Sequence, residues 1–279
     1  MAARLKEDKP WAKKGFAVAR EQFVLTPYVF PDTAPATSAP AKVVTIDGNA
    51  LTSWIVDGRE MLQAPLEPYF WKPENDNQHA ARFAQRTAVW KDTVEGVTVN
   101  YTVIDNRCVR VDMDYLPGGT DKPVMPKFGM RMRLPADFTA VEYYGRGPWE
   151  NYPDRKRSAF LGRYRMPLSE YETEYIHPQD NGNRCDVRWF TIGNGKETLR
   201  IDGAQPLCIR AWDYGEEDLE QAAHPHEIQR GRFVNLNIDL NVHGVGGVDT
   251  WGQRTLPQYT IDGNKPYHLT FFLKWDSDN

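Results

Sequence analysis

The sequence predicts an all-β protein built as a large antiparallel sandwich, and three observations support this. After residue 87, apolar and polar residues alternate with period two, as in strands with one buried and one solvated face. The runs are separated by hairpin signals such as Gly118-Gly119 and 262–264. Only residues 216–223 have the composition of a short helix. About ten strands with almost no helix are typical of two packed sheets.

The first 25 residues are predicted to be separate from the main domain. Residues 16–25 form a strand-like run that stops before Pro27. Residues 26–42 contain four prolines among small side chains, which is the composition of an extended linker. We therefore expect a strand-bearing segment at 1–25, a linker at 26–42 and the main domain at 43–279.

The alternating runs of the main domain are its predicted strands. The clearest are 97–103, 109–115 and 130–134, in which polar or charged residues occupy every second position. Two stretches, 143–155 and 175–184, are predicted to be loops because Gly and Pro are mixed with aromatic and charged residues. Further strands are expected at residues 186–192, 198–201, 207–212, 233–242 and 267–275.

Composition excludes several classes of protein. The chain has 279 residues and a net charge of −4, with 34 basic and 38 acidic residues well mixed. Without a basic stripe, nucleic acid is not an expected partner. No apolar run approaches the roughly 20 residues that span a bilayer, and the first residues are charged, so neither a membrane nor a secretion signal is expected.

The cysteines are predicted to be reduced core residues. Cys108, Cys185 and Cys208 are odd in number and lie in strand-like apolar contexts. Reduced cysteines favour a reducing compartment such as the cytoplasm. A periplasmic location of a full-length protein stays open at this point.

Five motifs in order resemble one known domain. The two loops carry YYGRGPWENYPDR at 143–155 and YIHPQDNGNR at 175–184. The other three motifs are PYFWKPENDN at 68–77, MPKFGM at 125–130 and GVGGVDTWG at 244–252. Over residues 51–275 the sequence resembles the carboxy-terminal domain of glycoside hydrolase family 2 beta-galactosidases, also found as the small subunit of two-chain enzymes. The resemblance implies the β-supersandwich of galactose mutarotases, preceded by the last strand of an immunoglobulin-like (Ig-like) domain.

The same resemblance implies that the reacting groups lie outside this chain. Retaining glycosidases need two carboxyl groups about 5 Å apart. In the family this pair belongs to a separate (β/α)8 barrel, and no alternation of strand and helix occurs here. We therefore assign no catalytic residue: Glu150 and Glu174 are interpreted as paired charges. The expected partner is a catalytic barrel domain or large subunit, and the isolated chain is expected to be inactive.

Five residues are candidates for contact with sugar. Trp251 follows three glycines, which let its loop approach a neighbour closely. By resemblance this indole stacks on the beta-galactoside, mainly at the leaving-group side, and Asp249 orients the loop. His177, Asn181 and Arg184 are candidates for binding hydroxyl groups. Two alternatives stay open: a free-standing carbohydrate-binding module, and an aldose epimerase with a histidine acid on the mutarotase scaffold.

No cofactor or metal is expected in this chain. His224 and His226 have strand-like spacing, but no Cys or carboxylate cluster completes a zinc site. No phosphate-binding glycine motif occurs. The resemblance places magnesium and sodium ions in the catalytic domain. It also implies an additional strand between Asn49 and Ala50, absent here, and a loop at 79–84 near the site entrance.

Overall fold

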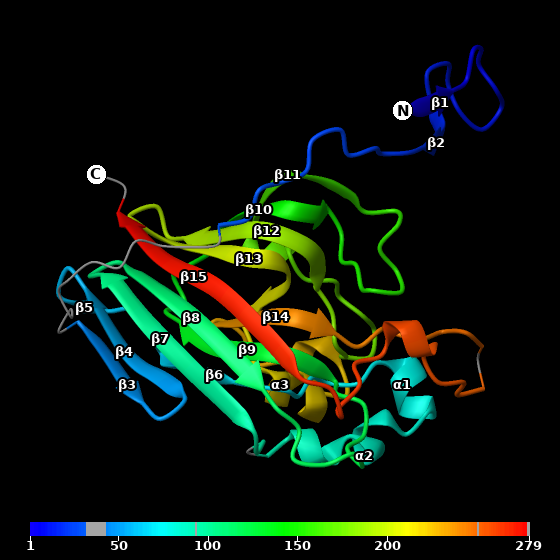
Figure 1. Cartoon of the computed structure of the whole chain (residues 1–279). Helices are drawn as coiled ribbons and strands as arrows, with labels where there is room; N and C mark the ends of the chain where they lie inside the picture. The colour runs from blue at the N-terminus through cyan, green and yellow to red at the C-terminus, as the bar shows by residue number, and fades with distance from the viewer. Residues whose placement is uncertain (32–42, 93, 250, 278–279) are drawn as a thin grey trace.

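The computed structural model describes residues 1–31, 43–92, 94–249 and 251–277 (Figure 1). The strands are β1 (Ala2–Arg4), β2 (Ala17–Arg20), β3 (Val44–Asp47), β4 (Ala50–Val56), β5 (Arg59–Glu60), β6 (Ala64–Pro68), β7 (Val97–Asp105), β8 (Cys108–Tyr115), β9 (Lys127–Leu134), β10 (Ala140–Gly147), β11 (Phe160–Pro167), β12 (Arg184–Gly193), β13 (Glu197–Trp212), β14 (Val234–Val242) and β15 (Tyr267–Ser277). The helices are α1 (Asp76–Ala80), α2 (Phe83–Arg86) and α3 (Glu216–Gln221), with 3-10 turns η1 (Ala88–Trp90), η2 (Leu168–Glu170), η3 (Pro225–Glu227) and η4 (Pro257–Tyr259).

The long strand β13 joins the two layers of the sandwich (Figure 1). Its first half, Glu197–Gly203, pairs with β15, which continues to β8 and β7. Its second half, Cys208–Trp212, pairs with β14, which continues through β9, β6 and β4 to β3. The other edge of β13 leads through β12 and β10 to β11. All the pairings between the described strands are antiparallel, so the predicted all-β antiparallel sandwich is confirmed.

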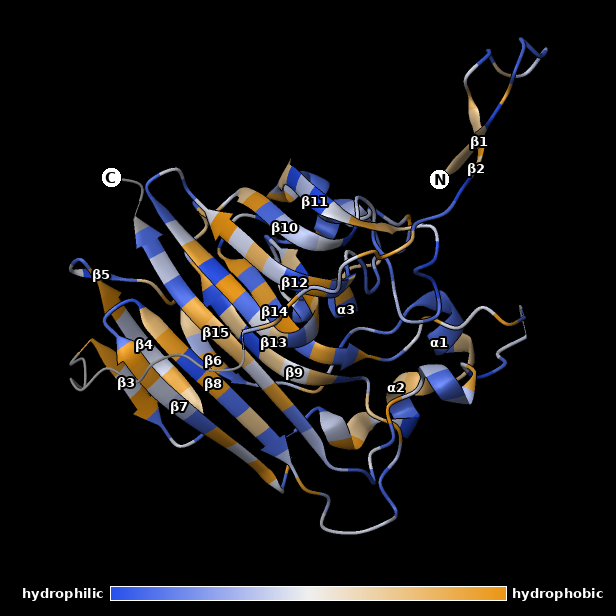
Figure 2. Ribbon diagram, turned by 45° about the horizontal axis from the view of Figure 1, so that its top comes forward, coloured by the Kyte–Doolittle hydropathy of each residue, from blue (hydrophilic) through white to orange (hydrophobic). Residues whose placement is uncertain are grey.

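Alternation along the strands builds the core between the layers. In Figure 2 the strands β8, β13 and β15 are banded, with hydrophobic and hydrophilic residues in turn. Val111 and Met113 of β8 are buried, as are Met130 and Met132 of β9, and the residues between them are partly exposed. Each such side chain contributes roughly 1.5–3 kcal/mol on burial.

A chain of buried charges lies on the strands next to this core. Arg210 lies at its centre and contacts two buried carboxylates. Asp180 contacts Nη1 of Arg210, and Asp239 contacts Nη2 at 3.3 Å. Lys72 lies 3.2 Å from Asp180, and Lys127 lies 2.7 Å from Asp239. All five side chains are fully buried. Burial would raise the pKa of Asp180, but the charges of Lys72 and Arg210 outweigh it and hold that pKa below its usual value.

The charge chain continues to α3. Asn237 accepts a hydrogen bond from Lys127 at 2.7 Å and donates one to Glu216 at 2.9 Å. Glu216 also accepts from Asn235 at 2.9 Å and contacts Arg131 at 3.2 Å. Because buried charges are tolerated only with partners, this network fixes the positions of the elements that supply it.

The prediction around the first loop motif needed two corrections. Residues 143–147 are the end of β10 rather than loop, and β11, which the sequence analysis did not predict, pairs with β10 over its whole length. Gly145 and Gly147 are unusual inside a strand. They are required here because a Cβ at Gly145 would lie 2.9 Å from Val187, and one at Gly147 would lie 2.3 Å from Tyr143 Oη.

Helix content was also underestimated. The predicted helix at 216–223 is confirmed as α3, but the segment expected to be a loop at 79–84 contains the end of α1 and the start of α2. A capping box between Asn75 and Gln78 begins α1, and this signal is visible in the sequence. The strands predicted at 198–201 and 207–212 are one continuous strand, β13.

The amino-terminal segment forms a separate two-stranded hairpin. β1 pairs only with β2, and both project away from the sandwich (Figure 1). Gln22 links the segment to the edge of β11, because its side chain donates to and accepts from Leu161 at 2.7 Å. Such a hairpin is marginally stable by itself. The assignment of residues 1–25 to an Ig-like domain stays a prediction. Residues 32–42 of the predicted linker lie outside the described residues.

A short hairpin stands at the position where the resemblance implies an additional strand. β3 and β4 form a hairpin with Asp47 opposite Ala50, joined by Gly48 and Asn49. The side chain of Asn49 binds to β7: it accepts a hydrogen bond from Val99 N at 3.0 Å and donates one to Val97 O at 3.1 Å.

Among the described residues no helix is long and apolar enough to cross a membrane.

The cysteines lead to a first prediction. All three are free and buried, and Cys185 Sγ lies 3.7 Å from Cys208 Sγ, although the two are distant in sequence. The neighbouring Cys208 and burial together raise the pKa of the Cys185 thiol, and burial raises the pKa of Cys108. Since thiolates are the reactive species, we expect a thiol reagent to label the native chain slowly and all three cysteines rapidly in denaturant. Rapid labelling of the native chain would contradict the buried assignment.

A second prediction concerns the buried charges. Asp180→Asn leaves Lys72 and Arg210 without one of their counter-charges, so it should lower the free energy of unfolding by about 3–5 kcal/mol. Urea unfolding followed by tryptophan fluorescence measures this loss. The control is Asp121→Asn, an exposed aspartate, which should change the free energy by less than about 0.5 kcal/mol. Equal stability of the two variants would contradict a structural role for the network.

Candidate functional site

Four of the five sequence motifs meet around one depression of about 300 Å³. This volume is at the lower end of the range for small-molecule pockets. The depression lies between α1, the loop after β10, the loop before β12 and the loop after β14. Its lining residues are Asn75, Asp76, Asn77, Tyr152, Arg155, Tyr175, Gln179, Asp180, Val245 and Gly246.

Glu150 joins the two loops that the sequence analysis singled out. Its carboxylate accepts hydrogen bonds from Arg155 in the first loop and from Tyr175 and the Gly182 amide in the second, the last at 2.9 Å. The predicted structural role of Glu150 as a paired charge is therefore confirmed. These contacts tie the two loops to each other.

The loop after β14 is held from both sides. Asp154 accepts hydrogen bonds from the amides of Val245 at 3.0 Å and Gly246 at 2.9 Å. From α1, Gln78 donates to the Gly244 carbonyl at 3.0 Å. A side chain at position 244 would not fit, because a Cβ there would lie 2.6 Å from Asp154 Oδ2.

Trp251 is presented to solvent from the end of this fixed loop. Its side chain is 90% exposed. Asp249 Oδ1 accepts hydrogen bonds from the amides of Trp251 at 2.9 Å and Gln253 at 3.0 Å, so Asp249 orients the turn. Gly252 has φ of +86° and packs so closely on α1 that a Cβ would lie 2.8 Å from Ala80 O. A large exposed indole on a constrained turn is suited to contact with a partner or a sugar.

The three remaining candidates differ in exposure: His177 is exposed like Trp251, whereas Asn181 and Arg184 are buried. His177 is exposed and lies 3.4 Å from Asp76 at the edge of the depression. Asn181 is buried and donates to Gln179 O and Tyr214 Oη, both at 3.1 Å. These contacts give Asn181 a structural role, and sugar binding by His177 or Asn181 stays a prediction.

Arg184 is also buried and occupied by the chain itself. It donates to Tyr143 Oη and Pro148 O at 3.1 Å and to Gly182 O at 2.9 Å, and its guanidinium lies 4.4 Å from the centre of the Tyr171 ring. Arg184 therefore ties the two loops to β10. Its predicted contact with sugar stays a prediction.

The residues that hold the site together were not predicted. Asp154 is one of several charged residues in the motif at 143–155, and neither Asn75 nor Gln78 was among the candidates. The only signal was the capping-box spacing of Asn75 and Gln78, because hydrogen bonds between segments about 90 to 170 residues apart leave no pattern in one sequence.

In the described part of the chain no group of three potential metal ligands occurs. His224 and His226 stack on each other with ring centres 5.6 Å apart.

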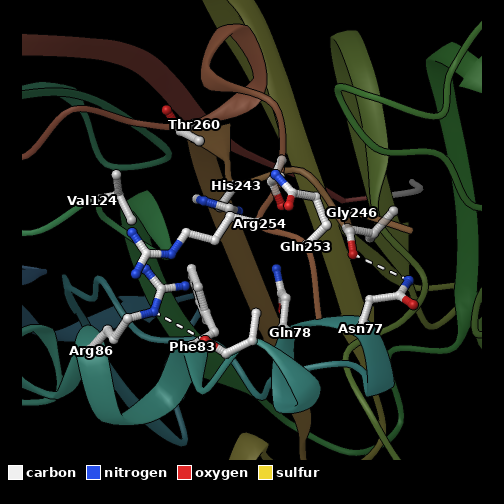
Figure 3. Close-up of a pocket in the computed structure, with 13 residues that line it drawn as sticks. Asn77, Gln78, Phe83, Arg86, Val124, His243, Gly246, Gln253, Arg254 and Thr260 are labelled. Atoms are coloured by element: carbon white, nitrogen blue, oxygen red, sulfur yellow. Dashed lines mark hydrogen bonds between the residues drawn. The ribbon is translucent and has the colours of Figure 1, made fainter. Parts of the chain in front are cut away.

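A second, smaller cavity shares Asn77, Val245 and Gly246 with the depression (Figure 3). His243, Phe83 and Arg86 contribute to its walls. His243 is buried, and its Nδ1 lies 2.9 Å from Gly244 O. Burial lowers the pKa of His243 to about 4, so the imidazole is neutral at neutral pH.

The family follows from comparison with known sequences. The profile described as beta galactosidase small chain matches residues 41–273. This chain belongs to the beta-galactosidase small chain family. A curated relative from Priestia megaterium, named beta-galactosidase, is 29% identical over 324 residues, which cover 98% of this chain and 31% of the relative. Beta-galactosidase BgaC of Bifidobacterium adolescentis is 35% identical over 184 residues, covering 64% of this chain and 17% of the relative.

This chain is shorter than the matched part of the Priestia relative. The Priestia alignment spans 324 residues, whereas the chain has 279, so the relative carries additional residues within the matched region. The chain spans about a third of the whole relative. Among solved structures, a putative aldose 1-epimerase from Escherichia coli K12 aligns over 84% of this chain and 98% of its own, with 9% identity and a TM-score of 0.42.

A third prediction follows from the neutral imidazole of His243. An unfolded histidine binds a proton near pH 6.5, but His243 in the native chain does so only near pH 4. The unfolded state therefore binds more protons between these values, and stability should fall as pH is lowered through this window, by on the order of 3 kcal/mol. The measurement is the free energy of unfolding from pH 7 to pH 4.

His243→Gln should reduce this pH dependence, whereas His226→Gln, at an exposed position, should leave it unchanged. The account of His243 is wrong if the pH dependence is the same in wild type and His243→Gln.

Proposed function

We propose that this chain is the non-catalytic C-terminal module of a retaining beta-galactosidase of glycoside hydrolase family 2. In this proposal it completes the sugar and aglycone pocket of a separate (β/α)8 catalytic domain or large subunit. The observation that carries the proposal is Trp251, an almost fully exposed indole on a turn fixed by Asp249 and packed on α1. Magnesium and sodium ions would bind to the catalytic domain and not to this chain.

Two carboxylates in the loop after β10, Glu150 and Asp154, agree with a non-catalytic role. A retaining enzyme needs one carboxylate free to attack and a second carboxyl group about 5 Å away to protonate the leaving group. Glu150 is engaged by Arg155, Tyr175 and Gly182, and Asp154 is engaged by two backbone amides. These groups serve to hold loops, which agrees with reacting groups supplied by another domain.

The exposed indole has a simple physical use at such a site. A flat apolar ring can cover the C–H face of a sugar and remove it from water, while hydroxyl groups at the sugar edge stay free for polar partners. Covering a side chain of this size contributes roughly 1.5–3 kcal/mol. The module would thus add affinity on the leaving-group side and exclude water from the reaction.

The fourth prediction tests this function with a chromogenic beta-galactoside. The isolated chain should show no turnover, and mixing it with the catalytic remainder of the enzyme should restore activity. Trp251→Ala should lower kcat/KM of the mixture by about 10- to 100-fold, the loss that removal of this contact implies. Trp11→Ala is the control and should leave kcat/KM unchanged, because Trp11 is also exposed, at 65%, but lies between β1 and β2 and does not line the depression.

Turnover by the isolated chain would overturn the proposal. So would a kcat/KM of the Trp251→Ala mixture equal to that of the wild-type mixture. Two further outcomes would indicate the alternatives. Saturable binding of galactose or lactose to the isolated chain in calorimetry would indicate a free-standing carbohydrate-binding module. Accelerated mutarotation of alpha-galactose in polarimetry would indicate an aldose epimerase.

A further inference from the structure

The smaller cavity beside α2 has an unusual balance of charge. It measures about 110 Å³, several times the roughly 10–15 Å³ that one water needs. Arg86 enters it from α2 and Arg254 from the loop after Trp251, and in Figure 3 their guanidinium groups lie next to each other. None of the residues that line it is acidic.

The two arginines lack the counter-charge that other arginines of this chain have. Arg131, Arg146 and Arg155, for example, each contact a carboxylate. The structure shows no carboxylate within ion-pair distance of Arg86 or Arg254 among the described residues. Burial and the charge of Arg254 both lower the pKa of Arg86, which agrees with two cations held close together.

The remaining hydrogen-bond donors of the cavity point to the kind of ligand that fits. Arg86 uses Nε to donate to Ala81 O at 3.1 Å, which leaves its two terminal nitrogens available. The threonine hydroxyls of the cavity are occupied, since Thr255 donates to Gly244 O at 3.3 Å and Thr260 to Pro257 O at 2.7 Å. The unoccupied donors are therefore mainly guanidinium groups, whose fork geometry matches an oxyanion.

We propose that this cavity binds a small oxyanion, a carboxylate or phosphate group, between Arg86 and Arg254. Two like charges in a partly buried site repel each other, and an anion between them converts this repulsion into two charge-assisted contacts. The ligand is either a free inorganic anion or the acidic group of a larger molecule, and both present the same chemistry to the arginines.

The anion would also act on the loop that carries the exposed indole. Arg254 is three residues after Trp251, and the intervening Gly252 packs against Ala80 of α1. An anion shared with Arg86 would therefore tie the Trp251 loop to α2. The site goes beyond the proposed function and does not depend on it, because anion binding is measured on this chain alone.

Isothermal titration calorimetry of the purified chain tests the proposal. Inorganic phosphate and acetate are titrated separately at pH 7 and constant ionic strength, with chloride as the balancing anion. We expect saturable binding of at least one of them at a single site. Preference for phosphate would indicate a tetrahedral oxyanion, and preference for acetate would indicate a carboxylate.

Matched substitutions locate the site. Arg86→Gln and Arg254→Gln should each weaken binding by about tenfold or more. Arg82→Gln removes the same charge four residues before Arg86, at an exposed position that does not line the cavity, and should leave the affinity unchanged. Thermal unfolding without anion checks that each variant is folded, and Arg254, on an exposed loop, carries the test if Arg86→Gln is unstable. Absence of saturable binding to wild type, or equal weakening by Arg82→Gln, would overturn the proposal.

Discussion

The buried ion pair between Arg210 and Asp180 is the constraint on which the site depends. Arg210 lies on β13, the strand that both layers share, and Asp180 belongs to the loop that precedes β12. Asp180 also contacts Lys72, which belongs to the segment leading into α1. One buried carboxylate therefore connects the central strand to two of the segments that form the depression. Because unpaired charges are strongly unfavourable in the interior, these segments have few alternative positions.

Hydrogen bonds extend this rigidity from the buried charges to the surface. Asp154 and Gln78 hold the loop after β14, and Asp249 orients the turn at its end. The result is a constrained backbone that carries an exposed indole, Trp251. Functional loops on a rigid scaffold combine a defined position with a side chain free to meet a ligand. In this chain the constrained loop presents Trp251 to solvent in a defined position.

Period-two alternation was sufficient to predict the sandwich, because strands with one buried face carry that pattern themselves. It failed at β10, where Gly145 and Gly147 occupy positions that neighbouring side chains fill in the folded chain. The exposed Trp251 was predicted from its glycine-rich loop and the family resemblance. The buried state of Asn181 and Arg184 was not predicted, since a polar residue in a loop motif has the same sequence pattern whether it binds a ligand or holds a neighbouring loop. Pairing across the fold decides between these roles.

The central claim is that this chain supplies a wall and one aromatic ring to a reaction centre located on another domain. A crystal structure of the chain assembled with its catalytic partner and a bound galactoside analogue tests this most directly. The account predicts that the indole of Trp251 lies within about 4 Å of the sugar, in van der Waals contact. It also predicts that the carboxyl groups nearest the anomeric carbon belong to the partner. A structure in which Trp251 remains in solvent, or in which a carboxylate of this chain contacts the anomeric carbon, would contradict the account.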